Sequence, residues 1–547
     1  MSEQYIDLET ARRAREKASR RKKAPTRDPN DERPVIRLTA GTLEKTVDQA
    51  ERALITANVD LFQRAGIIVG VGSTPMMTSH KKEVSAVTIC EVGEHRLLEL
   101  MMSAAAFEKW DARADDYVPA NCPLTIPKTL RERKGHLRFP VIAGVINGPT
   151  MRPDGSILAK PGYDEETGLF VDLGRERFPI ISDKPTQRDA NAALKVLEEL
   201  IVGFPFVGQA DQAVALAAML TAIVRRPLPT APAFAFSAPT AGSGKSMMVD
   251  LCSVLATGRE AGVIAPGRND EETEKRLASL LLAGAPIAID NAEHGVGGEL
   301  LCQILTQRTV RLRVLGKSDT PELPTNTLVS ITGNNLTLVG DMTRRALLCR
   351  LDAKEERPEL RKFDFDPVER AKAQRPTFMA AALTVLRAFH VAGRPQQVTR
   401  LGSFGEWSDL VRGALLWLGT ADPVETFEQT RAADPRIEHL RAIMVQWNKV
   451  VGGEKVSAND VAQRASERAG ANFGDQKGAF HNPEFREALL NVAGQGGFID
   501  AGKLGTFLGR NKGRVIGGMH FEPAGLIEGI KKWSLVKDRA GGDDTHF

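Results

Sequence analysis

The pattern of apolar and polar positions changes several times along the chain, which predicts several domains. Residues 34–185 mix short β-rich runs with an amphipathic helix that begins near Leu43, so we expect a mixed α+β accessory domain there. Residues 186–227 carry apolar positions at helical spacing and predict a pair of helices. Residues 228–355 alternate short apolar runs with helical segments, which is typical of an α/β domain with a parallel sheet.

The second half of the chain is helical at first and then changes character. Residues 356–450 predict a helical domain, and residues 451–481, rich in Gly, Ala, Ser and charge, predict a linker. Residues 482–540 predict two helices, the second capped by Asp500, and then a hairpin that turns around Pro523. Helices followed by a two-stranded wing are the order of a winged-helix module.

A glycine-rich turn between a strand and a helix is the first candidate for chemistry. The apolar run 234–237 is followed by the letters A-G-S-G-K-S and by a helix-compatible segment. In this arrangement the backbone N–H groups of the turn surround phosphate oxygens, Lys245 meets the outer phosphates, and the Ser246 hydroxyl binds Mg²⁺. The predicted nucleotide-binding residues are Ala241, Gly242, Ser243, Gly244, Lys245, Ser246 and Met247. The usual first glycine of such a loop is Pro239 here.

A second apolar strand ends in Asp290, which lies 45 residues after Lys245 (290 − 245). A carboxylate at this point lies at the edge of the sheet where Mg²⁺ is held, so the predicted metal ligands are Ser246 and Asp290 and the predicted cofactors are ATP and Mg²⁺. The next residue, where many such ATPases carry a glutamate, is Asn291. Glu293 is a candidate to orient the attacking water, although a solvated loop acid is the alternative, and Asp290 itself is a second candidate.

A third strand ends in Asn334, 44 residues after Asp290 (334 − 290). An amide at this place can hydrogen-bond the γ-phosphate and the attacking water, whereas Asn335 is a turn residue. Ten residues later, Arg344 and Arg345 are candidates for an arginine finger that reaches the nucleotide of a neighbouring subunit. The alternative is a pair of surface arginines.

Three stretches suggest contact with DNA. Residues 1–33 form a basic arm that is too polar to fold alone; a solubilising tail is the alternative. Residues 309–317 alternate arginine with apolar residues, as in a hairpin with one basic face, or as in an exposed edge strand guarded by charge. The candidate DNA contacts are Arg311, Arg313 and Lys317 in this hairpin, and Lys503, Arg510, Lys512 and Arg514 in the C-terminal module.

Taken together, A-G-S-G-K-S, I-A-I-D-N, the basic hairpin, T-G-N-N and D-M-T-R-R resemble the superfamily 3 helicases of the AAA+ class. The set is most similar to the helicase half of primase-helicase or replication proteins of prophages and integrative elements, chiefly over 228–352. The resemblance implies an α/β P-loop AAA+ core, with the mixed α+β domain before it and the helical and winged-helix modules after it. It also implies a hexameric ring that hydrolyses ATP and moves along single-stranded or forked DNA, with a separate primase as a possible partner.

Composition narrows the alternatives only slightly. The 547 residues include 73 Lys and Arg and 69 Asp and Glu, so the net charge is small and does not by itself indicate binding to nucleic acid. Five scattered cysteines without a C-x-x-C pair argue against a disulfide framework or zinc ribbon and favour reduced cytosol. The resemblance implies that this is the cytoplasm of a bacterial or phage-infected cell. No apolar run reaches the roughly 18 residues of a membrane helix.

Other functions stay open on the same residues. An origin-binding initiator or helicase loader, in which ATP is an assembly switch, is favoured by Asn291 because a weak water-orienting position slows hydrolysis. A nucleic-acid-sensing defence ATPase requires an effector domain that the sequence does not indicate. Primase activity is not expected, since the chain has neither a zinc ribbon nor an acidic metal triad.

Overall fold

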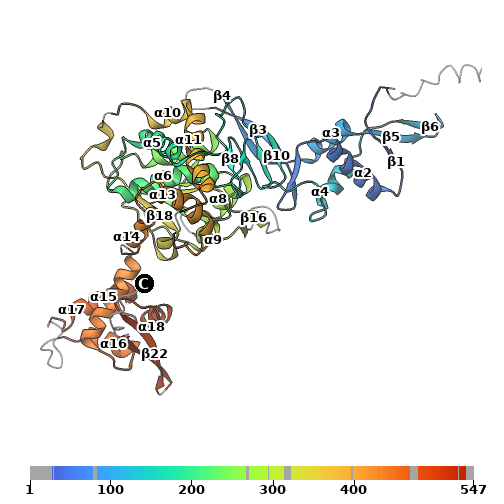
Figure 1. The fold of residues 1–547 in the computed structure, drawn as a ribbon. Helices are drawn as coiled ribbons and strands as arrows, with labels where there is room; N and C mark the ends of the chain where they lie inside the picture. Colours follow the sequence, from blue (N-terminus) through green and yellow to red (C-terminus); the bar gives the residue numbers. More distant parts are fainter. Residues whose placement is uncertain are drawn as a thin grey trace, which may run out of the picture.

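The computed structural model shows three bodies joined in chain order (Figure 1). An N-terminal domain adjoins a large central domain, and the long helix α15 (Pro435–Val450) leads from the central domain to a C-terminal domain. The structure describes residues 28, 30–77, 83–265, 270–292, 295–312, 322–361, 363–395, 398–432, 434–468, 479–527 and 529–537. The predicted basic arm, 1–33, therefore lies almost entirely outside the described residues.

The N-terminal domain is mixed α+β. Helices pack on one face of a three-stranded sheet, and their buried residues, among them Val47, Leu54, Leu97 and Leu130, form one core. The sheet order is β1-β5-β6, with β1 parallel to β5 and β5 antiparallel to β6. Its elements are β1 (Val35–Leu38), α2 (Leu43–Thr56), α3 (Glu94–Ala104), β5 (Ala106–Asp111), β6 (Asp116–Pro119) and α4 (Thr125–Glu132).

Small sheets connect this domain to the central one; β2-β3-β4 and β8-β9 are antiparallel, and β10-β11-β7 is mixed because β11 is parallel to β7. Two hairpins in these sheets are formed by β8 with β9 and by β10 with β11. The elements are β2 (Leu61–Arg64), β3 (Ile67–Met77), β4 (Glu83–Glu91), β7 (Gly144–Ile146), β8 (Thr150–Met151), β9 (Ile157–Leu158), β10 (Gly162–Asp164) and β11 (Leu169–Val171).

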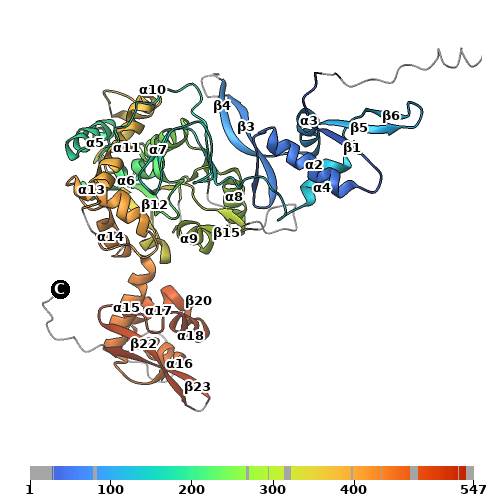
Figure 2. The same ribbon diagram turned by 45° about the vertical axis from the view of Figure 1, so that its right-hand side comes forward.

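A five-stranded parallel sheet organises the central domain, in the order β13-β14-β17-β12-β18. Its strand β12 is labelled within that domain in Figure 2. Every residue of β12 is buried, as expected for a parallel strand covered by helices on both faces. The strands are β12 (Ala233–Ala238), β13 (Val263–Ile264), β14 (Ile287–Ile289), β17 (Val329–Asn334) and β18 (Ala346–Arg350). The helices before and between them are α5 (Gln187–Ile201), α6 (Gln209–Val224), α7 (Lys245–Thr257), α8 (Asp270–Ala283) and α9 (Glu299–Thr306), and β15 (Thr309–Arg311) pairs with β16 (Glu322–Pro324).

The helices that follow the sheet share its core instead of forming a domain of their own. Phe378, Leu386 and Trp407 belong to the same buried cluster as the strands. The sequence pattern gave no sign of this, since an apolar helix face does not reveal which surface covers it. These elements are η1 (Gly340–Arg344), η2 (Pro358–Leu360), α10 (Pro367–Ala373), α11 (Arg375–Val391), α12 (Gly405–Trp407), η3 (Ser408–Arg412), α13 (Gly413–Trp417), η4 (Pro423–Glu425) and α14 (Thr426–Ala432).

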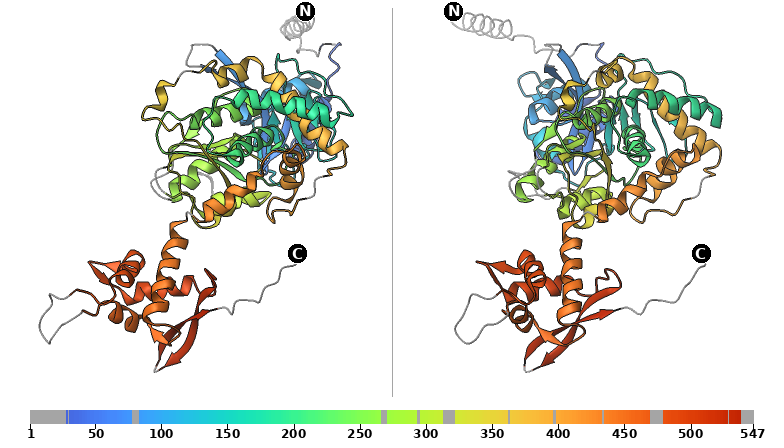
Figure 3. Two further views of the ribbon diagram at one scale, coloured as in Figure 1. Left: turned by 60° about the vertical axis from the view of Figure 1, so that its left-hand side comes forward. Right: turned by 90° about the vertical axis from the view of Figure 1, so that its left-hand side faces the viewer.

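The C-terminal domain has a core of its own, built around Trp447, Phe485, Phe521 and Trp533. In both views of Figure 3 this domain, coloured orange to red, hangs below the central domain on one helix. A three-stranded sheet of order β19-β23-β22 packs with its helices. The elements after α15 are β19 (Val456–Ser457), α16 (Ala458–Ala465), α17 (Pro483–Ala493), β20 (Gly494–Gln495), β21 (Phe498–Ile499), α18 (Ala501–Arg510), β22 (Met519–Ile527) and β23 (Ile530–Lys537).

Two boundaries differ from the sequence prediction. The domain begins near 435 instead of 482, because α15 contributes Trp447 to its core and α16, inside the predicted linker 451–481, contributes Val461. The wing does not turn at Pro523, which lies within β22 at an irregularity in the pairing with β23. Short helices with few apolar residues resemble linkers in composition, so only their packing distinguishes them.

In the part of the chain that the structure describes, no helix is long and apolar enough to cross a membrane. All five cysteines are free thiols.

Candidate active site

The glycine-rich turn forms a loop between the buried strand β12 and the first turn of α7. Gly242 and Gly244 have φ angles of 76° and 95°, a region that favours glycine. The Ser243 hydroxyl donates to the Thr240 carbonyl at 3.1 Å and closes the turn. The helix begins at Lys245 and runs for 13 residues, so its unpaired N–H groups face the loop and favour an anion there.

Lys245 and Asn334 meet at the carboxyl ends of two neighbouring strands. The Lys245 ammonium donates to Asn334 Oδ1 at 2.8 Å and to the Thr240 carbonyl at 2.9 Å. They meet because β12 and β17 are adjacent and parallel, with Ala238 opposite Asn334. Burial lowers the pKa of Lys245, and the negative charge of Asp290 opposes that shift.

Asp290 lies at the same edge, directly after β14. The Thr332 hydroxyl donates to Asp290 Oδ1, and the backbone N–H of Asn291 donates to the same hydroxyl at 3.1 Å. Thr332 thus holds the carboxylate in place from the neighbouring strand β17. Sequence reasoning did not single out Thr332; its position in T-G-N-N, on the strand that ends in Asn334, is the only signal for it.

Ser246 and Asp290 are the two residues whose side chains could hold Mg²⁺. Ser246 is exposed in the first turn of α7, and neither its hydroxyl nor Asp290 Oδ2 makes a side-chain hydrogen bond among the described residues. Within the same residues, no three His, Cys, Asp or Glu side chains gather into a metal cluster. A site of one carboxylate and one hydroxyl therefore fits Mg²⁺ that is shared with substrate phosphates, and does not fit an all-protein cage.

The position after Asp290 is strained. Asn291 has a φ angle of 52°, in the left-handed region that Asn tolerates better than most residues. The tight turn sends the chain away from β14 directly after the carboxylate. Glu293, the candidate to orient water, lies outside the described residues.

The two candidate finger arginines are in different environments. Arg345 donates to the Cys302 carbonyl at 2.7 Å and to the Thr306 hydroxyl at 3.2 Å, and only 14% of its side chain is exposed. Arg344 is 48% exposed and pairs with Asp341 at 3.0 Å on the surface. Arg345 is therefore held by contacts within the chain, whereas Arg344 lies exposed on the surface.

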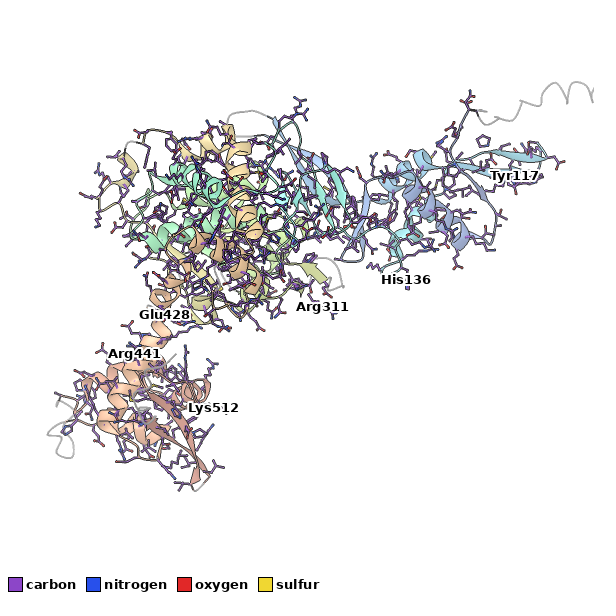
Figure 4. All side chains as sticks on the ribbon, in the orientation of Figure 1. Tyr117, His136, Arg311, Glu428, Arg441 and Lys512 are labelled. Carbon is purple, nitrogen blue, oxygen red and sulfur yellow. The ribbon has the colours of Figure 1, made fainter. Side chains whose placement is uncertain are left out.

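The basic hairpin is described only at its base. Arg311 is 77% exposed at the end of β15 and pairs with Glu322 at 3.6 Å. In Figure 4 it projects from the margin of the central domain. Arg313 and Lys317 lie outside the described residues.

The C-terminal cations are exposed on and after α18. Lys503 and Arg510 lie on the helix, and Lys512, labelled in Figure 4, and Arg514 follow it. On the wing, Lys532 donates to Asp460 Oδ2 at 2.9 Å and so belongs to an internal ion pair.

Two segments that the sequence analysis did not assign to the site close around the loop. A Cβ atom on Gly242 would lie 2.9 Å from the backbone nitrogen of Glu359, and one on Gly244 would lie 3.0 Å from Cε1 of Phe204. Both glycines are thus required by close contacts as well as by their φ angles. The segment with Glu359 has the sequence E-R-P-E-L-R-x-F (356–363), and only the fold shows that it lies against the loop.

No family model matches this chain, and no curated protein matches it. Among solved structures, it is similar to the "A form apo structure of NrS-1 C terminal region-CTR", at 10% identity over 73% of this chain and 78% of that chain, with a TM-score of 0.35. It is also similar to "The apo structure of NrS-1 C terminal region (305-718)", at 8% identity over 76% and 81%, with a TM-score of 0.33. We base no argument on matches at these scores.

Proposed function

We propose that this chain is a P-loop nucleoside triphosphatase of the AAA+, superfamily 3 type, which hydrolyses ATP with Mg²⁺. The observation that carries the proposal is the meeting of Lys245, Asp290 and Asn334 at the carboxyl edge of one parallel sheet. Ligands of open α/β sheets bind at that edge. The strand order β13-β14-β17-β12-β18 supports the proposal because the loop after β12 and the ends of β14 and β17 are then neighbours.

Each side chain has a defined task in this proposal. The N–H groups of the loop and the Lys245 ammonium bind the β- and γ-phosphates, with Lys245 leaving Asn334 for the phosphate. Asn334 is then free to hold the attacking water. Asp290 accepts a hydrogen bond from that water or from a neighbouring water molecule. Mg²⁺, when bound by Ser246 and Asp290, neutralises charge that develops on the phosphates. Arg344 of an adjoining copy supplies a second cation.

We further propose that the protein is a DNA helicase, hexameric, and active in the replication of a phage or mobile element. The resemblance of the motif set carries this finer proposal, and the exposed cations of Arg311 and of α18 support it. The test is hydrolysis of ATP with and without single-stranded DNA, together with displacement of an annealed oligonucleotide from a fork. Lys245→Ala serves as the inactive variant. Hydrolysis without any displacement would remove the helicase from the proposal and leave the ATPase.

A second function is favoured by one observation, namely Asn291 in the strained turn after Asp290. An amide there is a weaker water-orienting group than a carboxylate, so ATP would act chiefly as an assembly switch for an origin-binding initiator or helicase loader. This alternative predicts tight, sequence-selective binding of duplex DNA by the C-terminal domain and very slow hydrolysis. Footprinting on the DNA of the phage or mobile element tests for sequence-selective binding, and oligonucleotide displacement tests for unwinding. Together the two measurements distinguish the initiator or loader from the helicase.

A further inference from the structure

A cavity of about 150 Å³ opens beside the glycine-rich loop. Three segments line it: the end of α5 with residues 203–205, the loop from Ser243 to Met247, and residues 361–367 after η2. The third segment follows β18 and is far in sequence from the loop, so the cavity exists only in the folded chain. The loop itself was predicted to bind phosphate, whereas the walls contributed by residues 200–205 and by the segment after η2 were not.

Three aromatic residues, Phe204, Phe363 and Phe365, line this cavity. Phe204 lies against Gly244, with Cε1 3.0 Å from where a Cβ atom would be, and Phe363 is 48% exposed above Gly203. A cavity lined by aromatic rings beside a phosphate-binding loop has the chemistry that accepts a heterocyclic base.

Arg361 has an unused donor at the same cavity. Its Nη2 donates to the Gly203 carbonyl at 3.1 Å, and its guanidinium lies 5.1 Å from the centre of the Phe363 ring. Its Nη1 is buried and has no hydrogen-bond partner among the described residues. Most buried donors are paired, so an unpaired one at a cavity indicates a partner that arrives with a ligand. Asp364 lines the cavity as well and supplies an acceptor.

We propose that this cavity binds the nucleoside half of the triphosphate, with Phe204 against the base and Arg361 Nη1 donating to the base or ribose. The inference rests on the proposed function, because it requires the phosphates to lie on the loop at Lys245. It adds a nucleoside site in which Phe204 and Arg361, both outside the phosphate-binding motifs, contact the ligand beside the loop. It also gives Asp364, otherwise a charged residue of a connecting segment, a place at the ligand.

The test separates nucleoside from phosphate by comparing two probes, ATP and inorganic tripolyphosphate, each with Mg²⁺, in calorimetric titrations of the full chain. Phe204→Leu removes the aromatic ring and Arg361→Met removes the donor while keeping an apolar stem. We expect each variant to weaken ATP binding at least about fivefold, from lost stacking or a lost charged hydrogen bond, and to leave tripolyphosphate within about twofold. The matched controls are Phe206→Leu, two residues away and not in the cavity wall, and Arg357→Met, exposed at the start of η2.

The outcomes assign failure to one proposal or the other. If Lys245→Ala weakens both probes but the two cavity variants bind ATP like the parent protein, the nucleoside site is wrong and the ATPase proposal stands. Equal losses for ATP and tripolyphosphate would also overturn it, because the variants would then act on the loop. If the parent protein binds neither probe, both proposals fail. Melting temperatures without ligand show whether a variant is folded, and Phe204→Trp, which keeps a stacking surface, should retain ATP binding.

Discussion

Lys245 and Asn334 are joined by a hydrogen bond of 2.8 Å that links the first turn of α7 to the end of β17. The two residues are 89 positions apart, and the proposed function assigns both of them to the γ-phosphate and the attacking water. In this arrangement Asn334 Oδ1 accepts a hydrogen bond from the Lys245 ammonium, which in the proposed function binds the nucleotide's phosphates. Binding of the triphosphate would therefore exchange one partner of Lys245 for another and release the amide.

The first prediction concerns Asn334 itself. Replacing it with alanine removes the amide that orients water, while the loop and Lys245 remain, so we expect kcat for ATP hydrolysis to fall about 100-fold with KM nearly unchanged. Steady-state phosphate release checks this. The control is Asn335→Gly, since Asn335 has a φ angle of 46° that glycine adopts freely. An equal loss in both variants would assign the effect to the turn and not to the amide.

The second prediction distinguishes the two arginines. Arg344→Ala should lower hydrolysis by about 1000-fold in the assembled protein with little change in melting temperature, because this exposed side chain makes only a surface pair in its own subunit. Arg345→Ala should lower the melting temperature, because its bonds to Cys302 and Thr306 hold α9. Turnover and thermal unfolding, measured on both variants, check this. If Arg345→Ala lowers turnover and Arg344→Ala lowers the melting temperature instead, Arg345 and not Arg344 is the arginine finger.

The third prediction concerns stability. The Arg375 side chain is 1% exposed, pairs with Glu176, and donates from Nε to the Val254 carbonyl at 2.8 Å near the end of α7. Burial lowers the pKa of Arg375, and Glu176 opposes that shift. Arg375→Met should cost about 3 kcal/mol of the free energy of unfolding, because several buried partners lose their donor.

Urea unfolding followed by tryptophan fluorescence measures this loss. Lys372→Met is the matched control: its pairs with Glu260 and Glu369 lie on the surface, so its removal should cost about 1 kcal/mol or less. Similar losses in the two variants would contradict the role given to Arg375.

The fourth prediction addresses DNA contact by the C-terminal domain. Lys503 and Arg510 are exposed on α18, so the double variant Lys503→Ala/Arg510→Ala should weaken duplex DNA binding about tenfold or more and reduce the salt dependence of binding. Lys532→Ala is the control, because that lysine is held by Asp460 within the domain. Anisotropy titrations at several salt concentrations check it. Unchanged affinity in the double variant would show that Lys503 and Arg510 of α18 do not contact DNA.

The fifth prediction is a dependence on pH. Hydrogen bonds from the Ser457 backbone and from Lys532 lower the pKa of Asp460 to about 2. A carboxyl whose pKa is lowered by folding stabilises the native state above its unfolded pKa of about 3.9, and this contribution disappears as the pH falls through the folded value. Asp460→Asn should therefore lower the melting temperature at pH 7, and its difference from the parent protein should close between about pH 4 and pH 2.

Melting curves across this pH range provide the measurement. Glu454→Gln, which removes an exposed pair with Arg464, is the control and should show a smaller difference at every pH. A gap that persists at pH 2 would mean that the effect does not come from the charge of Asp460.

The sequence alone indicated which residues stand at the ends of the central strands. The glycines, Lys245, Asp290 and Asn334 follow apolar runs directly, and parallel strands bring their carboxyl ends to one edge, so local pattern and one general rule are sufficient. The helices that begin at Leu43 and at Ala501, the second behind its Asp500 cap, were readable for the same reason, since periodicity and capping are local.

Only the tertiary structure decided what lies against the loop and where the last domain begins. Arg361 and the Gly203 carbonyl are 158 positions apart, and no local pattern predicts that they enclose a cavity beside Gly244. Likewise, α15 and α16 belong to the C-terminal core because Trp447 and Val461 are buried there. An apolar face shows that a segment must be covered, whereas the choice of covering surface depends on packing among distant segments, which is settled only when the whole chain folds.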